Sequence, residues 1–189
     1  MAGDRIREIF DVRKTLVGDD AVGLLAKLHW EIEQLEARKG EEMLVRMFMS
    51  FNAASTAWHL HEWIWKLSNE AQRCLLLDAV DAETRDWQGF VLGLQRKSPA
   101  MAICRQLANA GKHMTLKHGR EDIYAELIAE GDHEYPEGAV LLLVNGERHR
   151  DIDVYAAALK LWLKVYRDLG LKHADKIRAA APWLDEEHN

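Results

Sequence analysis

Three side chains with the chemistry to hold a phosphodiester follow one another at intervals of four residues. They are Arg105, Asn109 and His113, which on a helix would form one row along one face. The guanidinium would neutralise the phosphate, the amide would orient it, and the imidazole would transfer a proton. The row therefore predicts an anion site with catalytic groups, and its plainer interpretation is a helix face exposed to solvent.

This row lies within a stretch, from Trp87 to Arg120, that contains no acidic residue. The stretch has a formal charge of +6 and the rest of the chain −12, in a protein of net charge −6. Its basic residues are Arg96, Lys97, Arg105, Lys112, Lys117 and Arg120. This asymmetry predicts a site for RNA or another phosphate-bearing anion, with Lys112 and Lys117 as further anion-binding residues. The alternative is a basic face that pairs with acidic neighbours.

A second polar row occurs earlier in the chain, again at helical spacing. It consists of Asn52, Ser55, His59, Glu62 and Lys66. We expect His59 and Glu62 to hydrogen-bond each other, which would orient the imidazole and raise its pKa. Leu44, Phe48 and Phe51 precede the row on the same face and are expected to be buried. A solvent-facing stripe or a structural network is the alternative interpretation of the polar residues.

Metal and cofactor chemistry has little support in the sequence. His59 and Glu62, with His29 or His113 from another helix, would be the residues of a metal site. Di-iron helical bundles carry two Glu-x-x-His motifs, and that pair of motifs is absent. There is no glycine-rich phosphate loop or dinucleotide motif either, so we expect no metal and no cofactor.

Most of the chain is predicted to be helical, because apolar residues recur at helical spacing. The expected helices cover residues 19–40, 41–68, 70–80, 81–95, 99–117 and 151–170, and residues 4–17 form a frayed helix or an arm. Ser98 is expected to cap the helix that begins at Pro99. Gly89 and Gly93 are expected to break the segment 81–95.

A small sheet separates the last two long helices. Alternating and apolar runs predict strands at 123–130 and 139–144, and Asn145-Gly146 favours a tight turn into a third strand at 147–150. Asp151 or Asp153 is then expected to cap the last long helix. The predicted fold is mainly α: an antiparallel helical bundle with a small β-meander, about 121–150, inserted before the last long helix.

Length and composition predict one cytoplasmic domain. The 189 residues fit a single helical-bundle domain, 1–189, with a C-terminal tail from about 171. The charged beginning of the chain argues against a signal peptide, and no apolar stretch reaches the length of a membrane span. The two cysteines lack the spacing of a zinc or redox motif, so we expect reduced thiols and no membrane partner.

Two segments together resemble a set of small uncharacterised bacterial helical proteins. They are WHLHEWIW at residues 58–65 and ICRQLANAGKH at residues 103–113. In those proteins a late helix carries an Ala-Asn-x-x-Lys-His element, which is followed by a β-hairpin and a Trp-containing helix. The resemblance covers roughly residues 50–165, and it implies the same order of elements here.

Asn109 and His113 also resemble part of the signature of HEPN proteins. These are helical bundles, often dimeric, and many are metal-independent ribonucleases of toxin–antitoxin and phage-defence systems. The resemblance implies that His113 is the general acid or base, that Asn109 orients the phosphate, and that Arg105 stabilises its charge. The signature has an Arg directly before the polar residue, where this chain has Ala108, and this departure argues against ribonuclease activity.

The sequence leaves three functional hypotheses. The first is a HEPN-like protein that binds RNA or another phosphate-bearing anion, with ribonuclease activity in doubt. The second is a non-enzymatic helical interaction or regulatory module, whose exposed Trp residues and basic face dock an acidic protein partner or a second copy in a homodimer. The third and weakest is a metal-dependent bundle enzyme.

Overall fold

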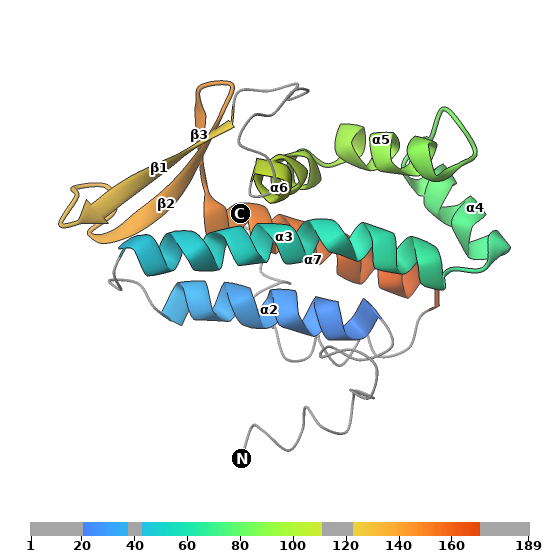
Figure 1. The fold of residues 1–189 in the computed structure, drawn as a ribbon, viewed down its shortest axis with the longest axis horizontal. Coiled ribbons are helices and arrows are strands. Elements are labelled where there is room, and N and C mark those ends of the chain that lie inside the picture. Colours follow the sequence, from blue (N-terminus) through green and yellow to red (C-terminus); the bar gives the residue numbers. More distant parts are fainter. Residues whose placement is uncertain (1–20, 38–42, 111–122, 171–189) are drawn as a thin grey trace, which may run out of the picture.

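The computed structural model describes residues 21–37, 43–110 and 123–170 (Figure 1). The helices are α2 (Ala21–Ala37), α3 (Met43–Leu67), α4 (Glu70–Ala79), α5 (Trp87–Lys97), α6 (Pro99–Ala110) and α7 (Asp151–Asp168). The strands are β1 (Ile123–Glu130), β2 (Glu137–Val144) and β3 (Glu147–Arg150), which form one antiparallel sheet in the order β1-β2-β3. A mainly helical fold with a small sheet before the last helix is therefore confirmed.

The long helices lie side by side, with the sheet at one end and α4 and α5 at the other (Figure 1). Helix α3 packs against α2, α6 and α7. Helices α2 and α3 run antiparallel, α7 runs in the same direction as α3, and α6 is seen nearly end-on across α3 (Figure 1). No helix within residues 21–37, 43–110 and 123–170 has both the length and the apolar character needed to cross a membrane.

The core side of α7 carries one stripe of buried residues at helical spacing. Tyr155, Leu159 and Trp162 are fully buried, as are their neighbours at helical spacing. The indole Nε1 of Trp162 donates a hydrogen bond of 2.9 Å to the backbone oxygen of Ala57 on α3. Since a buried indole needs such an acceptor, this bond fixes the position of α7 along α3.

The β-meander follows the predicted pattern closely. Asn145 and Gly146 adopt positive φ angles of 52° and 85° between β2 and β3, as a tight hairpin turn requires. The pairing brings Val144 opposite both Ile123 and Glu147. The sheet ends at Arg150, and α7 begins at the next residue, so no loop separates the sheet from the last helix.

Helix α5 continues through both of its glycines, and the prediction of a break there is wrong. Its first turn is capped by Asp86, whose side chain accepts a hydrogen bond of 2.8 Å from the Gly89 N–H. A Cβ at Gly89 would lie 1.9 Å from the backbone oxygen of Thr84, and one at Gly93 would lie 2.6 Å from Val80 Cγ2. The glycines thus allow the segment before α5 to pack directly against the helix.

Helix α3 exposes some of its largest apolar side chains. Leu44, Phe48 and Phe51 are 50, 56 and 38 % exposed, so the prediction that they are buried is wrong. Half of the ten buried residues of α3, which packs on its neighbours through this side, are small: Ser50, Ala53, Ala54, Thr56 and Ala57. Small side chains let helices approach closely, and this leaves an exposed apolar stripe of Leu44, Phe48 and Phe51 on another face.

Candidate functional site

Arg105 lies half-buried on α6, where it is held by a neutral partner. Its Nη1 donates a hydrogen bond of 2.7 Å to Oε1 of Gln95 on α5. Within the part of the chain that the structure describes, no carboxylate lies within ion-pair distance of this guanidinium. The side chain is therefore positioned while its charge is not cancelled by a described acidic group.

The predicted row can be followed only part of the way. Asn109 is half-buried on α6, four residues after Arg105. His113 and the anion-binding candidates Lys112 and Lys117 lie outside the described residues. The convergence of Arg105, Asn109 and His113 on one ligand therefore stays a prediction.

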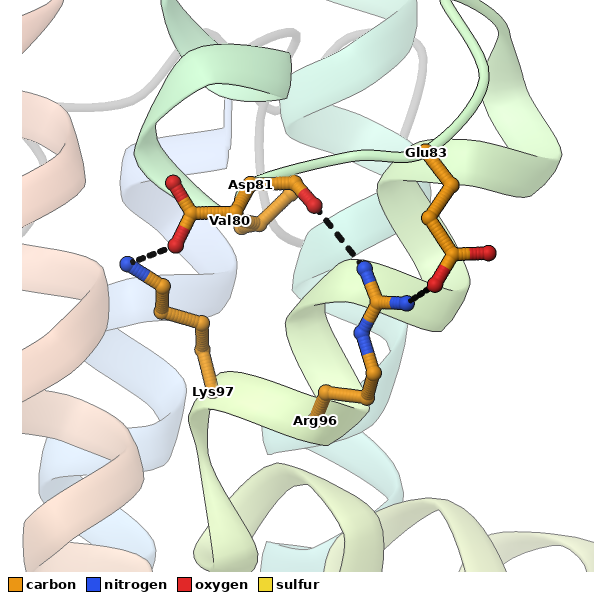
Figure 2. A pocket seen from close by; sticks show the side chains of 5 residues that line it. All are labelled: Val80, Asp81, Glu83, Arg96 and Lys97. Carbon is orange, nitrogen blue, oxygen red and sulfur yellow. Dashed lines mark hydrogen bonds and ion pairs between the residues drawn. The ribbon is translucent and has the colours of Figure 1, made fainter.

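Two other basic residues of the acid-free stretch are already paired with acids (Figure 2). Arg96 forms an ion pair with Glu83 and donates a hydrogen bond of 2.8 Å to the backbone oxygen of Asp81. Lys97 forms an ion pair of 2.6 Å with the Asp81 carboxylate. These groups line an open surface hollow of about 440 Å³. The alternative interpretation, a basic face neutralised by neighbouring acids, is confirmed for these two residues.

The second polar row lies on the same face of α3 as the exposed apolar stripe. Ser55 and His59 are half-buried, and Glu62 accepts a hydrogen bond of 2.5 Å from Lys66 one turn later. This bond holds the pKa of the Glu62 carboxyl below its usual value. Glu62 is thus neutralised by a lysine, and the predicted hydrogen bond between His59 and Glu62 stays a prediction.

On α3 the imidazole of His61 is buried, whereas that of His59 is half-buried. The ring lies between Trp58 and Trp87, with centroid distances of 4.0 and 5.0 Å. Its Nδ1 contacts the backbone oxygen of Trp58. Burial lowers the pKa of His61 to about 4, and the Arg105 guanidinium contributes to the same direction. A neutral imidazole of α3 therefore stacks against Trp87 of α5, within the electrostatic influence of Arg105 on α6.

A polar cluster that the sequence did not reveal is buried between α3 and α7. We call Arg46, Ser50, Asp151 and Tyr155 the Asp151 cluster. The Ser50 and Tyr155 hydroxyls form a hydrogen bond of 2.7 Å, in which either group can be the donor. The Ser50 hydroxyl also lowers the pKa of the Asp151 carboxyl, against the larger effect of burial. The two hydroxyls and the carboxyl therefore form one buried polar group of neighbours.

Asp151 itself is only 2 % exposed. Its Oδ1 accepts a hydrogen bond of 2.8 Å from the Ile152 N–H, whereas Oδ2 has no hydrogen-bond partner within the described residues. Burial raises the pKa of Asp151 to about 6. The prediction that Asp151 or Asp153 caps α7 is wrong, since Arg150 occupies the cap position without a side-chain hydrogen bond.

Arg46 connects the same cluster to the sheet. Its Nη1 donates hydrogen bonds of 3.3 and 3.1 Å to the backbone oxygens of Glu137 and Gly138 at the start of β2. The guanidinium is buried, and its charge lowers the pKa of Asp151 against the larger effect of burial. The Asp151 cluster therefore joins α3, β2 and α7 through buried polar groups.

The other reactive side chains that the structure describes do not assemble into a metal or thiol site. Among residues 21–37, 43–110 and 123–170, no three His, Cys, Asp or Glu side chains are placed to share a metal ion. Cys104 is fully buried, and burial raises the pKa of its thiol. The thiolate is the reactive form, so Cys104 is a packing residue, whereas Cys74 on α4 is exposed.

The site thus consists of Arg105 and Asn109 on α6, next to the buried His61 of α3, with the polar row of α3 on an adjoining face. The described residues do not extend to the other half of the predicted anion site. Comparison of the chain with protein-family models, with curated proteins and with solved structures found no match.

Proposed function

We propose that this chain is a cytoplasmic protein with a helical-bundle scaffold that binds RNA through its phosphates at Arg105 and Asn109 of α6. The observation that supports the proposal is the neutral partner of Arg105, the amide of Gln95. Arg96 and Lys97, from the same acid-free stretch, are ion-paired. A guanidinium that is held in place without a carboxylate keeps its attraction for a phosphate.

The proposed site is completed by residues from the segment that follows α6, namely His113, Lys112 and Lys117. Arg105 neutralises the phosphate charge and Asn109 orients it, while the two lysines add attraction along the RNA backbone. Binding rather than cleavage is the function proposed, since Ala108 stands where the HEPN signature has its Arg.

Binding is measured by fluorescence anisotropy with a fluorescein-labelled single-stranded RNA at several salt concentrations. Arg105→Gln is expected to weaken binding by about tenfold, since hydrogen bonds to charged groups contribute roughly 1.5–3 kcal/mol. It should also reduce the slope of log Kd against log salt by about 1. Arg96→Gln is the matched control because it removes the same charge from a residue that is already paired. Equal weakening by both substitutions, or no binding by the wild type, contradicts the proposal.

Cleavage is tested separately with the wild type and His113→Ala at equal concentration. Loss of RNA cleavage in the variant alone would make His113 a catalytic residue. Equal rates, or no cleavage by either protein, would rule out ribonuclease activity at His113. The anisotropy measurements would then decide the binding function.

The exposed apolar stripe favours a second candidate function, the docking of another protein, with a second copy of the chain as the simplest case. Leu44, Phe48 and Phe51 present adjoining apolar surface on one helix face, and such patches are typical of interfaces. Size-exclusion chromatography with light scattering tests this candidate. Phe48→Asp should dissociate a dimer, whereas Leu75→Asp, at an exposed apolar residue of α4, should not. A wild-type protein that is strictly monomeric would rule out the homodimer.

A further inference from the structure

Asp151 occupies the point at which the sheet becomes the last helix. Strand β3 ends at Arg150 and α7 begins at Asp151, so no loop separates the β-meander (β1, β2 and β3) from this residue. Helix α3 contributes Ser50, whose hydroxyl favours the carboxylate, and Arg46, which donates hydrogen bonds to the start of β2. Through Arg46, the Asp151 cluster therefore makes a polar contact between the β-meander and the helices.

The ionised form of Asp151 is incompletely satisfied in this position. Its Oδ2 has no hydrogen-bond partner within the described residues, although the side chain is almost completely buried. A buried polar atom without a partner carries a desolvation cost, which is larger when the atom is charged. Protonation removes that charge, so the closed arrangement suits the neutral carboxyl better than the carboxylate.

The surroundings of the carboxyl are mixed in charge. The groups that face it directly or through Tyr155 are Arg46 and Ser50 of α3, Arg150 of β3, Tyr155 of α7, Cys104 of α6 and Glu31 of α2. The two arginines and Ser50 favour ionisation, but burial outweighs them and raises the pKa of Asp151 to about 6. The balance between the two protonation states therefore lies close to neutral pH.

We propose that the protonation state of Asp151 sets how firmly the β-meander is docked on α3 and α7, so that the β-meander opens more readily as the pH rises from 5 to 8. Opening exposes the carboxylate to water, which solvates it better than the closed site does. Protonated Asp151 gains nothing from this exposure and keeps the β-meander closed. The β-meander is thereby a pH-responsive element of the fold.

The direction and size of the effect follow from linkage. A folded-state pKa of about 6 against the ordinary aspartate value of 3.8 means that the closed state loses stability relative to the open state as the pH rises through about 6. If opening restores the ordinary pKa, the opening constant rises about tenfold between pH 5 and pH 8. The open state remains a minor population at both pH 5 and pH 8, as expected of local unfolding in a native protein.

Hydrogen–deuterium exchange of the full chain at pH 5 and pH 8, corrected for intrinsic exchange rates, measures this opening. We expect the opening constant of the β2 amides, residues 139–144, to rise about tenfold at pH 8 in the wild type, while the central amides of α7 do not follow. Asp151→Asn should abolish the rise. Asp153→Asn, which removes the same charge from an exposed residue of the same helix turn, should retain it.

Two further measurements test the proposal even if Asp151→Asn folds poorly: the Ser50→Ala variant and a direct titration of the Asp151 carboxyl. Ser50→Ala removes a hydroxyl that favours the carboxylate, so the midpoint of the pH effect should move to higher pH. The ¹³C chemical shift of the Asp151 carboxyl should titrate near pH 6 in the wild type. A carboxyl that titrates near pH 4, exchange of β2 that does not change with pH, or an unchanged rise in Asp151→Asn overturns the proposal.

Discussion

Three basic residues that are close in the sequence differ in how far their positive charge is available to a ligand: Arg105, Arg96 and Lys97. Arg96 and Lys97 reach back to acids that precede α5, whereas Arg105 meets the amide of Gln95. A count of charges along the chain treats these residues as equal. Their availability to an anion is decided by partners that the fold supplies.

The hydroxyls of Ser50 and Tyr155 give a prediction at the same scale. Ser50→Ala should lower the free energy of unfolding by about 1–3 kcal/mol, because it leaves the buried Tyr155 hydroxyl, which now lies 2.7 Å from Ser50, without that partner. Tyr155→Phe should lower the free energy of unfolding less when it is combined with Ser50→Ala than when it is made alone. The expected coupling energy between the two substitutions is roughly 1 kcal/mol. Urea denaturation of the two single variants and the double variant measures the coupling.

Ser55→Ala, at a half-buried position on the same helix, is the control and should change the free energy of unfolding by less than about 0.5 kcal/mol. Additive effects of Ser50→Ala and Tyr155→Phe would show that the buried hydroxyl pair does not act as a unit.

Among the elements, those with a single unambiguous pattern were predictable. Helix α7 has one apolar stripe, and the β-meander has alternating residues with a turn that needs Asn145 and Gly146. Helix α3 is apolar around much of its circumference, so periodicity could not tell which side is buried, and Phe48 was placed wrongly. The buried hydrogen bond between Ser50 and Tyr155 could not be predicted because the two residues are 105 positions apart in the sequence.

The contact between α5 and the segment before it gives a prediction for an element. Gly89→Ala should destabilise the protein by roughly 1–3 kcal/mol, because the added Cβ would lie 1.9 Å from the Thr84 oxygen. This cost exceeds the roughly 1 kcal/mol by which Ala is the better helix former. Gln88→Ala, at the adjacent exposed position, should leave stability nearly unchanged. An equal or greater urea midpoint for Gly89→Ala would contradict the close contact.

For the whole molecule, two buried titratable groups respond to acid in opposite ways. His61 has a pKa lowered to about 4, so its contribution to stability is lost as the pH falls from about 6.5 towards 4. Asp151 has a pKa raised to about 6, so the closed structure gains stability as the pH falls through 6. Both shifts have burial as their largest cause.

These opposing shifts predict that the two groups partly offset each other in the free energy of unfolding between pH 7 and pH 5. His61 should remove about 2 kcal/mol over this interval and Asp151 should restore about 1 kcal/mol. Relative to the wild type, His61→Gln should therefore lose less stability on going from pH 7 to pH 5, and Asp151→Asn should lose more. Urea denaturation at the two pH values tests this, with His133→Gln, at an exposed turn residue, as control. The same slope in all three variants would contradict it.

The contrast between the two cysteines gives the molecule a built-in chemical reporter. Cys74 is exposed on α4, while Cys104 is enclosed by the core near Tyr155. A maleimide dye should couple at once to the first thiol and reach the second only when the interior comes apart. The slow second addition, followed by mass spectrometry, would then give the frequency of complete unfolding under native conditions, with no engineered label.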